Sequence, residues 1–353
     1  MGPRANDPDD LDPALDALAE AFEAGRTEEA LAQANALLAR APKSPEALHY
    51  RAACEVELND LEAAAETYQR ALAVAPDEPE LLLGAADLCI CHPGEDREEL
   101  EQGLSYCARG RKLAARSQDR ELRFEFLLLE GIAYNQLGEC DEALERLDEA
   151  VKLDPESSEA QVERAIALFE LCRFEPARAA FLKATAGPEP AWAHHYLGLI
   201  AERAADLREA KRHFGIAREL APEDFPAPVR LSDKEFDAAV EAAIARLSDE
   251  VKRHLENTTV SVEEIPSDDE LTSSRPPLSP SILGVFRGTP VGERSISSAA
   301  DHFPAAIVLY QRNLERFART RDELIEQIGI TLMHEVGHLI GLDEHDLWER
   351  GLE

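Results

Sequence analysis

The sequence has few aromatic side chains and no long apolar run. Aromatic residues make up 6% of the 353 residues, whereas alanine and leucine are abundant, which favours helix. No apolar stretch reaches the roughly 18 residues that a membrane span needs. The N-terminus also lacks the basic and apolar regions of a signal peptide. We therefore expect no membrane partner and a cytoplasmic location.

Basic residues are also scarce. There are 37 lysine and arginine residues against 71 aspartate and glutamate residues, giving a formal net charge of −34. A field of this sign repels phosphate backbones, so we expect no nucleic-acid partner. Solubility accounts for the charge, and a preference for basic partners is the alternative interpretation.

Cysteine is absent from the C-terminal half of the chain. The six cysteines all lie at or before Cys172, and none forms a C-x-x-C pair. Their positions in helical patterns indicate small buried residues rather than metal ligands. Free cysteines without a disulfide pattern fit a reducing compartment.

What is present is a repeat. Within residues 12–222 a proline follows an alanine-containing run at regular intervals. Pro42 and Pro76 are 34 residues apart, and Pro155 and Pro222 are 67 residues apart, close to two such periods. The interval between Pro76 and Pro155 is longer, so one repeat there is irregular. This period resembles that of the tetratricopeptide repeat, in which helical hairpins stack into an α-solenoid.

Small residues at corresponding positions of the repeat units strengthen the resemblance. Gly131, Ala143 and Ala150 occupy them in one unit, and Gly198 and Ala210 in the last unit. Small side chains let the two helices of a hairpin approach closely. The resemblance implies about six hairpins, the third irregular, whose surface binds a partner protein or peptide.

The remaining sequence predicts a linker and a second domain. Residues 223–231 are rich in proline and form the linker, and residues 232–353 form the domain. Ser232 and Glu235 form a capping box that begins a helix, and residues 266–281 have the composition of a loop. Three strands are predicted from alternating or apolar β-branched patterns, at 258–265, 282–288 and 305–311.

The last predicted helix, residues 322–340, carries the motif H-E-x-x-H. His334 and His338 are one turn apart and therefore lie on the same face, where two imidazoles can bind one zinc ion at about 2.0–2.1 Å. Glu335 can act as general base on a zinc-bound water. Gly341 then ends the helix and turns the chain, so that a third ligand can follow it.

The C-terminal sequence resembles the small zincin-like metallopeptidases. The resemblance lies in residues 282–295 and 307–352 and in the predicted helix at residues 236–247. The family signature is H-E-x-x-H-x-x-G-x-x-D, with both histidines and the aspartate as ligands. The resemblance implies one Zn²⁺ ion per chain, held by His334 and His338, with Glu335 as catalytic base.

The sequence departs from this signature at the third ligand. Glu344 stands where the family has aspartate, and glutamate also binds zinc through oxygen at about 2.0–2.2 Å. His345 and then Asp343 are the alternatives. Tyr310 and Arg287 are candidate oxyanion donors by chemistry alone, and we favour ordinary packing or a salt bridge for both.

The predicted fold is thus mainly α, a tetratricopeptide α-solenoid followed by a small α+β zincin-like domain. The predicted function is zinc-dependent hydrolysis of peptide bonds, with the repeats recruiting a substrate or partner protein. The alternative is a non-catalytic interaction protein whose zinc only stabilises the C-terminal domain. Glu335 favours the peptidase, because a structural zinc site does not need a carboxylate between its ligands.

Overall fold

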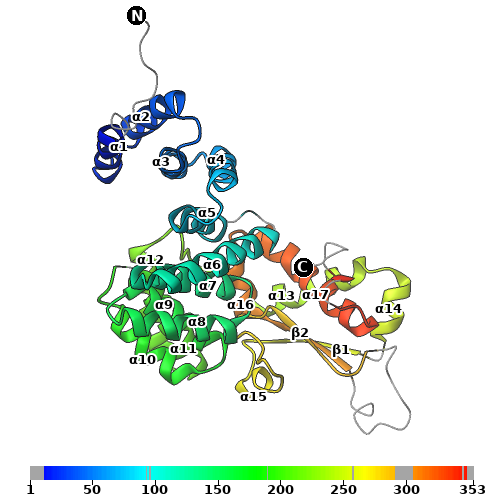
Figure 1. The fold of residues 1–353 in the computed structure, drawn as a ribbon. Helices are drawn as coiled ribbons and strands as arrows, with labels where there is room; N and C mark the ends of the chain where they lie inside the picture. Colours follow the sequence, from blue (N-terminus) through cyan, green and yellow to red (C-terminus); the bar gives the residue numbers. More distant parts are fainter. Residues whose placement is uncertain are drawn as a thin grey trace, which may run out of the picture. The chain divides into compact units, whose positions relative to one another are not determined.

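A computed structural model describes residues 12–92, 94, 97–188, 190–256, 258–290, 305–343 and 346–347. It contains seventeen helices and three strands within these residues (Figure 1). The chain is therefore mainly helical, as predicted. It divides into two compact units between Leu168 and Phe169.

The first unit consists of helices that pack in consecutive pairs. α1 contacts α2, α3 contacts α4, α5 contacts α6, and α7 contacts α8. Most of α9 also belongs to this unit. The helices are α1 (Asp12–Glu23), α2 (Thr27–Arg40), α3 (Pro45–Glu57), α4 (Leu61–Val74), α5 (Pro79–Cys91), α6 (Arg97–Ser117), α7 (Arg120–Gln136), α8 (Cys140–Leu153) and α9 (Ser158–Glu170).

The pairing depends on the small residues that the sequence places in these helices. A Cβ atom at Gly131 would collide with the Leu147 side chain of the facing helix. Ala143 and Ala150 are fully buried. The close approach expected of a tetratricopeptide hairpin is therefore present. The helices also end two residues before the spaced prolines, as α8 does at Leu153.

The irregular third repeat agrees only in part with its sequence pattern. Turn-forming residues around Cys89–Asp96 and Ser117–Arg120 predict that the extra residues lie in turns, and the helices do break between Ser117 and Arg120. However, α5 continues through Cys91, and α6 is 21 residues long. α7 is also long, at 17 residues. Much of the excess therefore lengthens helices, whose residues are mostly good helix formers such as Glu, Leu, Ala and Arg.

The second unit joins the last repeat helices to a small sheet and its covering helices. α10 contacts α11, and α11 packs along α12. The helices are α10 (Phe174–Ala184), α11 (Pro190–Arg203), α12 (Leu207–Leu220), α13 (Asp233–Arg246), α14 (Asp249–Leu255), α15 (Asp268–Leu271), α16 (Gln311–Phe317) and α17 (Arg321–Ile340). The strands are β1 (Thr258–Glu263), β2 (Gly284–Arg287) and β3 (Ala305–Tyr310).

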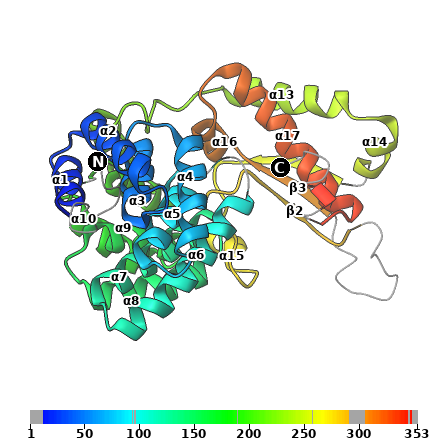
Figure 2. The same ribbon diagram turned by 45° about the horizontal axis from the view of Figure 1, so that its top comes forward.

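The sheet has the order β1-β3-β2. β1 runs parallel to β3, with Val260 opposite Ile307, and β2 runs antiparallel to β3, with Phe286 opposite Ile307. The helices α13 and α17 pack side by side and cover one face of the sheet (Figure 2). The core between them includes Ile307, Leu309, Leu332 and Val336.

Local signals account for most boundaries in this unit. The predicted capping box of Ser232 with Glu235 is formed at α13, and the sequence pattern Thr320-x-x-Glu323 forms a second one at α17. One prediction was wrong: the loop 266–281 contains the short helix α15. Ser267 caps this helix by accepting a hydrogen bond from the Glu270 N–H.

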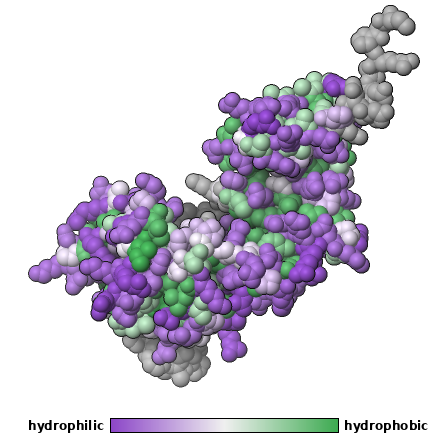
Figure 3. Space-filling view, turned by 90° about the vertical axis from the view of Figure 1, so that its left-hand side faces the viewer, coloured by the Kyte–Doolittle hydropathy of each residue, from purple (hydrophilic) through white to green (hydrophobic). Residues whose placement is uncertain are grey.

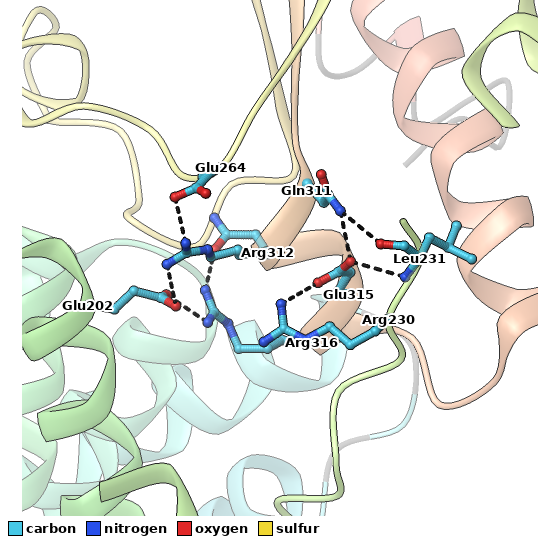
Figure 4. Close-up of polar contacts among 9 residues, drawn as sticks. Glu202, Arg230, Leu231, Glu264, Gln311, Arg312, Glu315 and Arg316 are labelled. Carbon is cyan, nitrogen blue, oxygen red and sulfur yellow. Dashed lines mark hydrogen bonds and ion pairs between the residues drawn. The ribbon is translucent and has the colours of Figure 1, made fainter. Parts of the chain in front are cut away.

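The helix α16 connects several segments of this unit through polar contacts (Figure 4). Glu315 is 1% exposed and accepts hydrogen bonds from Arg230, from the Leu231 N–H and from Gln311. The Asn313 side chain donates to the carbonyl oxygens of Pro280 and Ile282. The last residues of the predicted linker are therefore fixed onto α16.

Hydrophilic residues cover most of the face shown in Figure 3, in keeping with the high content of charged residues. Within the part of the chain that the structure describes, none of the helices has the length and apolar character to cross a membrane.

Candidate metal centre

The two histidines of the motif converge at the C-terminal end of α17. The Nε2 atoms of His334 and His338 are 3.1 Å apart. Two nitrogen ligands at about 2.05 Å from a tetrahedral zinc ion are separated by about 3.3 Å. The side chains are thus already spaced as a pair of zinc ligands, and they fit the metal without rearrangement of the helix.

The end of the helix fixes the orientation of His338. Gly341 has a φ of 92°, and its N–H and that of Leu342 donate to the carbonyls of His338 and Gly337. This reversal ends the helix and directs the Leu342 carbonyl back to the His338 ring, 3.1 Å from Nδ1. A proton on Nδ1 leaves Nε2 as the nitrogen that binds metal.

Glu335 lies between these histidines in sequence and against β2 in space. It is 6% exposed, and a Cβ atom at Gly284 would lie 3.2 Å from its Cγ and Oε1 atoms. The absence of a side chain at Gly284 therefore makes room for this carboxylate. All three motif residues line a cleft of about 470 Å³. Its other wall is formed mainly by the β2 segment, including Ile282, Val285, Phe286, Gly288 and Pro290.

The third ligand was predicted among three consecutive residues. Asp343 lines the cleft, but its Oδ1 atom accepts a hydrogen bond from the Asp346 N–H, which holds it in a turn. Glu344 and His345 lie outside the described residues. Within the described ranges, no three His, Cys, Asp or Glu side chains are placed together to hold a metal ion. The choice between the three residues remains a prediction.

The two candidate oxyanion donors are not near the cleft. Phe286 and Leu309 face α17, so the alternation of a strand places Arg287 and Tyr310 on the opposite face of the sheet. There both donate to Glu270. Burial raises the pKa of this carboxyl, but the hydrogen bonds from Arg287 and Tyr310 outweigh it and hold the pKa below its ordinary value. These contacts agree with the interpretation favoured above, that Arg287 and Tyr310 have ordinary packing and salt-bridge roles.

Sequence reasoning missed two groups of this site. Gly284 was included in a predicted strand, but nothing in the sequence distinguishes it from Gly288. The Leu342 carbonyl is a backbone atom, so its role depends on how the chain turns after Gly341. A glycine opposite the H-E-x-x-H helix becomes informative only when strand and helix are placed together.

Comparison with solved structures identifies the repeat fold. A structure described as a functional characterization of Pseudomonas aeruginosa pilF matches with a TM-score of 0.51 and 19% identity, covering 65% of this chain and 96% of that chain. PilW, described as a widely conserved type IV pilus biogenesis factor, matches with a TM-score of 0.52 and 19% identity, covering 60% and 94%. At this identity the likeness concerns the fold alone. No curated protein matches the chain.

Family models match both parts of the sequence. The tetratricopeptide repeat matches residues 21–90 and 128–190. The zincin-like metallopeptidase model matches residues 255–352, a range that includes β2 and the whole of α17. The chain therefore combines tetratricopeptide repeats in its N-terminal region with a zincin-like metallopeptidase domain at residues 255–352.

Proposed function

We propose that the protein is a zinc-dependent peptidase whose repeats recruit its substrate or a partner protein. The observation that carries the proposal is the position of Glu335. Its carboxylate is buried in the wall of an open cleft, beside two histidine nitrogens spaced as zinc ligands. A site that only stabilised the fold would have no use for a carboxylate there.

The residues of the cleft would have different roles in hydrolysis. His334, His338 and a third residue, with Glu344 ranked before His345 and Asp343, would hold one Zn²⁺ ion. When bound, the metal supplies Lewis acidity and lowers the pKa of water toward 7. Glu335 takes a proton from the attacking water and delivers it to the leaving amine.

The cleft also offers a place for an extended peptide. Among the strands that the structure describes, β3 is paired on both sides, whereas β2 lies at an edge of the sheet and lines the cleft. Of the strands 282–288 and 305–311, we therefore propose that the first pairs with substrate by strand addition. The repeats would contribute a second binding surface, as helical repeat arrays commonly do.

The domain limits 12–222, 223–231 and 232–353 are part of the proposal. They describe sequence modules and not compact units, since α10 to α12 fall in the same compact unit as the sheet. The cytoplasm remains the proposed location, because none of the six cysteines, all of them among the described residues, forms a disulfide.

The test measures zinc and proteolysis separately. Bound zinc is determined by elemental analysis in wild type, His334→Ala and Glu335→Gln, and cleavage of a broad peptide library by mass spectrometry. We expect His334→Ala to lose zinc. Glu335→Gln should keep zinc but lose activity by about 10²–10⁴-fold. Equal activity of wild type and Glu335→Gln would leave the alternative, a non-catalytic interaction protein with structural zinc.

The same assay identifies the third ligand. Single substitutions Asp343→Ala, Glu344→Ala and His345→Ala are compared for zinc content. A large loss in Glu344→Ala alone supports the open catalytic site. Losses in both Glu344→Ala and His345→Ala indicate four protein ligands, which is the arrangement of a closed structural site.

A further inference from the structure

A second cavity lies in the same compact unit, and it shares no lining residue with the metal cleft. Its volume is about 430 Å³. It is enclosed by α12, the end of α11, the linker and α16. Volumes of this size are typical of small-molecule sites.

The charge of this cavity is opposite to that of the chain. Its lining contains five basic and two acidic residues, in a protein of net charge −34. The basic residues are Lys211, Arg218, Arg230, Arg312 and Arg316. Such a concentration of positive charge is not explained by composition.

Within the cavity wall, two guanidinium groups share one carboxylate (Figure 4). Arg312 and Arg316 contact the two oxygens of Glu202 at 3.0 and 2.7 Å. The second partner of Arg312, Glu264, is 74% exposed. Burial lowers the pKa of Arg316 despite Glu202, and the neighbouring Arg230 and Arg312 lower it further. The buried positive charge is therefore only partly compensated.

Helix α12 contributes two further cations, Lys211 and Arg218. Neither has a carboxylate partner in the described part of the chain. The Nε atom of Arg218 is buried and lacks any hydrogen-bond partner there. A buried guanidinium N–H without an acceptor is costly. A ligand oxygen would satisfy it, and arginine is well suited to carboxylate and phosphate oxygens.

The rest of the wall is aromatic. His195 stacks on Phe225, with ring centroids 4.6 Å apart, and Phe214 also lines the cavity. Burial, followed by the charge of Arg316, lowers the pKa of His195 to about 4. The His195 ring is therefore neutral near pH 7 and serves as an apolar surface rather than a further cation.

We propose that this cavity binds a small organic anion, a carboxylate or phosphate attached to an apolar group. The apolar group packs on His195, Phe214 and Phe225. The anionic group is held by Lys211 and Arg218, in the positive field of Arg312 and Arg316.

Trp192 provides the measurement, because its ring lies 4.9 Å from that of Phe225. The full chain is used with Trp348→Phe, which leaves Trp192 as the single tryptophan. The probes are 3-phenylpropanoate, phenyl phosphate and the neutral 3-phenylpropanamide. We expect both anions to change the fluorescence and to bind at least tenfold more tightly than the amide, with affinity falling as salt is raised.

Substitutions test the cations named. Lys211→Gln combined with Arg218→Gln should weaken anion binding at least tenfold, whereas Arg208→Gln, on the same helix but outside the cavity, should leave it unchanged. Circular dichroism checks that each variant folds, and the salt dependence of the wild type requires no substitution. Equal binding of acid and amide, or no binding of either anion at 10 mM by fluorescence and calorimetry, would overturn the proposal.

A final arm separates two sources of such an anion. An acetylated tripeptide ending in phenylalanine is compared with its C-terminal amide and with 3-phenylpropanoate. Binding of the peptide acid alone assigns the cavity to peptide C-termini, and binding of the free acid alone assigns it to small metabolites. Both results support the anion site.

Discussion

At the scale of single residues, the cleft lined by the H-E-x-x-H motif depends on a glycine, because there is no room for a side chain at Gly284. Gly284 allows β2 to approach α17, where a Cβ atom would lie 2.8 Å from Thr331 Cγ2 and 3.2 Å from Glu335 Oε1. We expect Gly284→Ala to displace Glu335 and to cost about 1–3 kcal/mol of stability. Peptide cleavage should fall by more than zinc content, as measured by the library assay and elemental analysis.

Gly329 provides the matched control. It lies inside α17, and a Cβ atom there meets nothing within 4 Å. Gly329→Ala should therefore raise the free energy of unfolding by about 0.5–1 kcal/mol and leave cleavage unchanged. If both alanine variants behave alike in urea unfolding and in cleavage, close packing at Gly284 is not what positions Glu335.

The side chains proposed to bind zinc and to catalyse hydrolysis could be picked out from the sequence for a simple reason. His334, Glu335 and His338 are close in sequence, and one helical period fixes how they face each other. Gly284 and the Leu342 carbonyl could not be predicted in the same way. Their roles arise from contacts made across the fold or by the backbone, and neither leaves a distinctive residue pattern.

At the scale of elements, the segment after α17 must fold back for a third ligand to be near the histidines. Leu347 is fully buried, and a Cβ atom at Gly337 would collide with its side chain. We expect Gly337→Ala to push this segment away and to weaken zinc binding at least about tenfold, although both histidines are retained. Zinc titration with a competing chelator measures the effect, and Gly329→Ala on the same helix should bind zinc as wild type does.

The turns between the repeat helices contain an unfavourable backbone conformation at regular positions. Residues with positive φ occur at Gly25 and Asn59, 34 residues apart, and again at Gly138, Cys172 and Ala205, which follow one another at 34 and 33 residues; Gln118 has one in the irregular third repeat. Ala205 has a φ of 58°, which glycine adopts without strain. Ala205→Gly should therefore stabilise the protein by about 0.5–1 kcal/mol in urea unfolding. The control Ala204→Gly lies one residue earlier, where φ is not positive, and should not stabilise the protein. If both glycine variants were more stable, the cause would not be backbone strain at Ala205.

Elements were predicted well where a local signal marks their ends. Thr320 with Glu323 and Gly341 bound α17, and the observed helix begins one residue before the prediction. The turn predicted at Ser117–Arg120 separates α6 from α7, but the length of α6 was not predicted, because the extra residues of this repeat were assigned to turns. The short α15 was missed since a four-residue helix has no periodicity to detect.

At the scale of the whole molecule, the repeat period predicted the fold of the N-terminal region, and the zincin signature that of the C-terminal domain. The sequence could not predict that α11 would be joined to α16 by Glu202, Arg312 and Arg316. Glu202 lies more than 100 positions before both arginines, and glutamate and arginine are found throughout the chain. Their pairing becomes evident only once the fold has brought the two helices together.

One consequence at this scale is a dependence of stability on pH. His195 of α11 contacts the rings of Phe225 in the linker and Phe214 in α12, and its pKa in the folded protein is lowered to about 4 by burial and by the charge of Arg316. Its pKa in the unfolded chain is near 6.5. Between these values the unfolded state binds more protons than the folded state, so stability decreases as pH falls from about 7 to 4. The contribution is at most about 3 kcal/mol.

The effect of this single histidine is separated from the many carboxylates by a difference measurement. His195→Phe retains an aromatic ring against Phe225 and removes the titrating group. Urea unfolding, followed by the fluorescence of Trp192 in the Trp348→Phe background, gives the stability of both proteins at each pH. The other titrating groups are common to both proteins, and phenylalanine does not titrate, so the stability of wild type relative to His195→Phe should fall steadily between pH 7 and 4. Parallel pH profiles of the two proteins would mean that burial against Phe214 and Phe225, near Arg316, does not hold this ring in its neutral form.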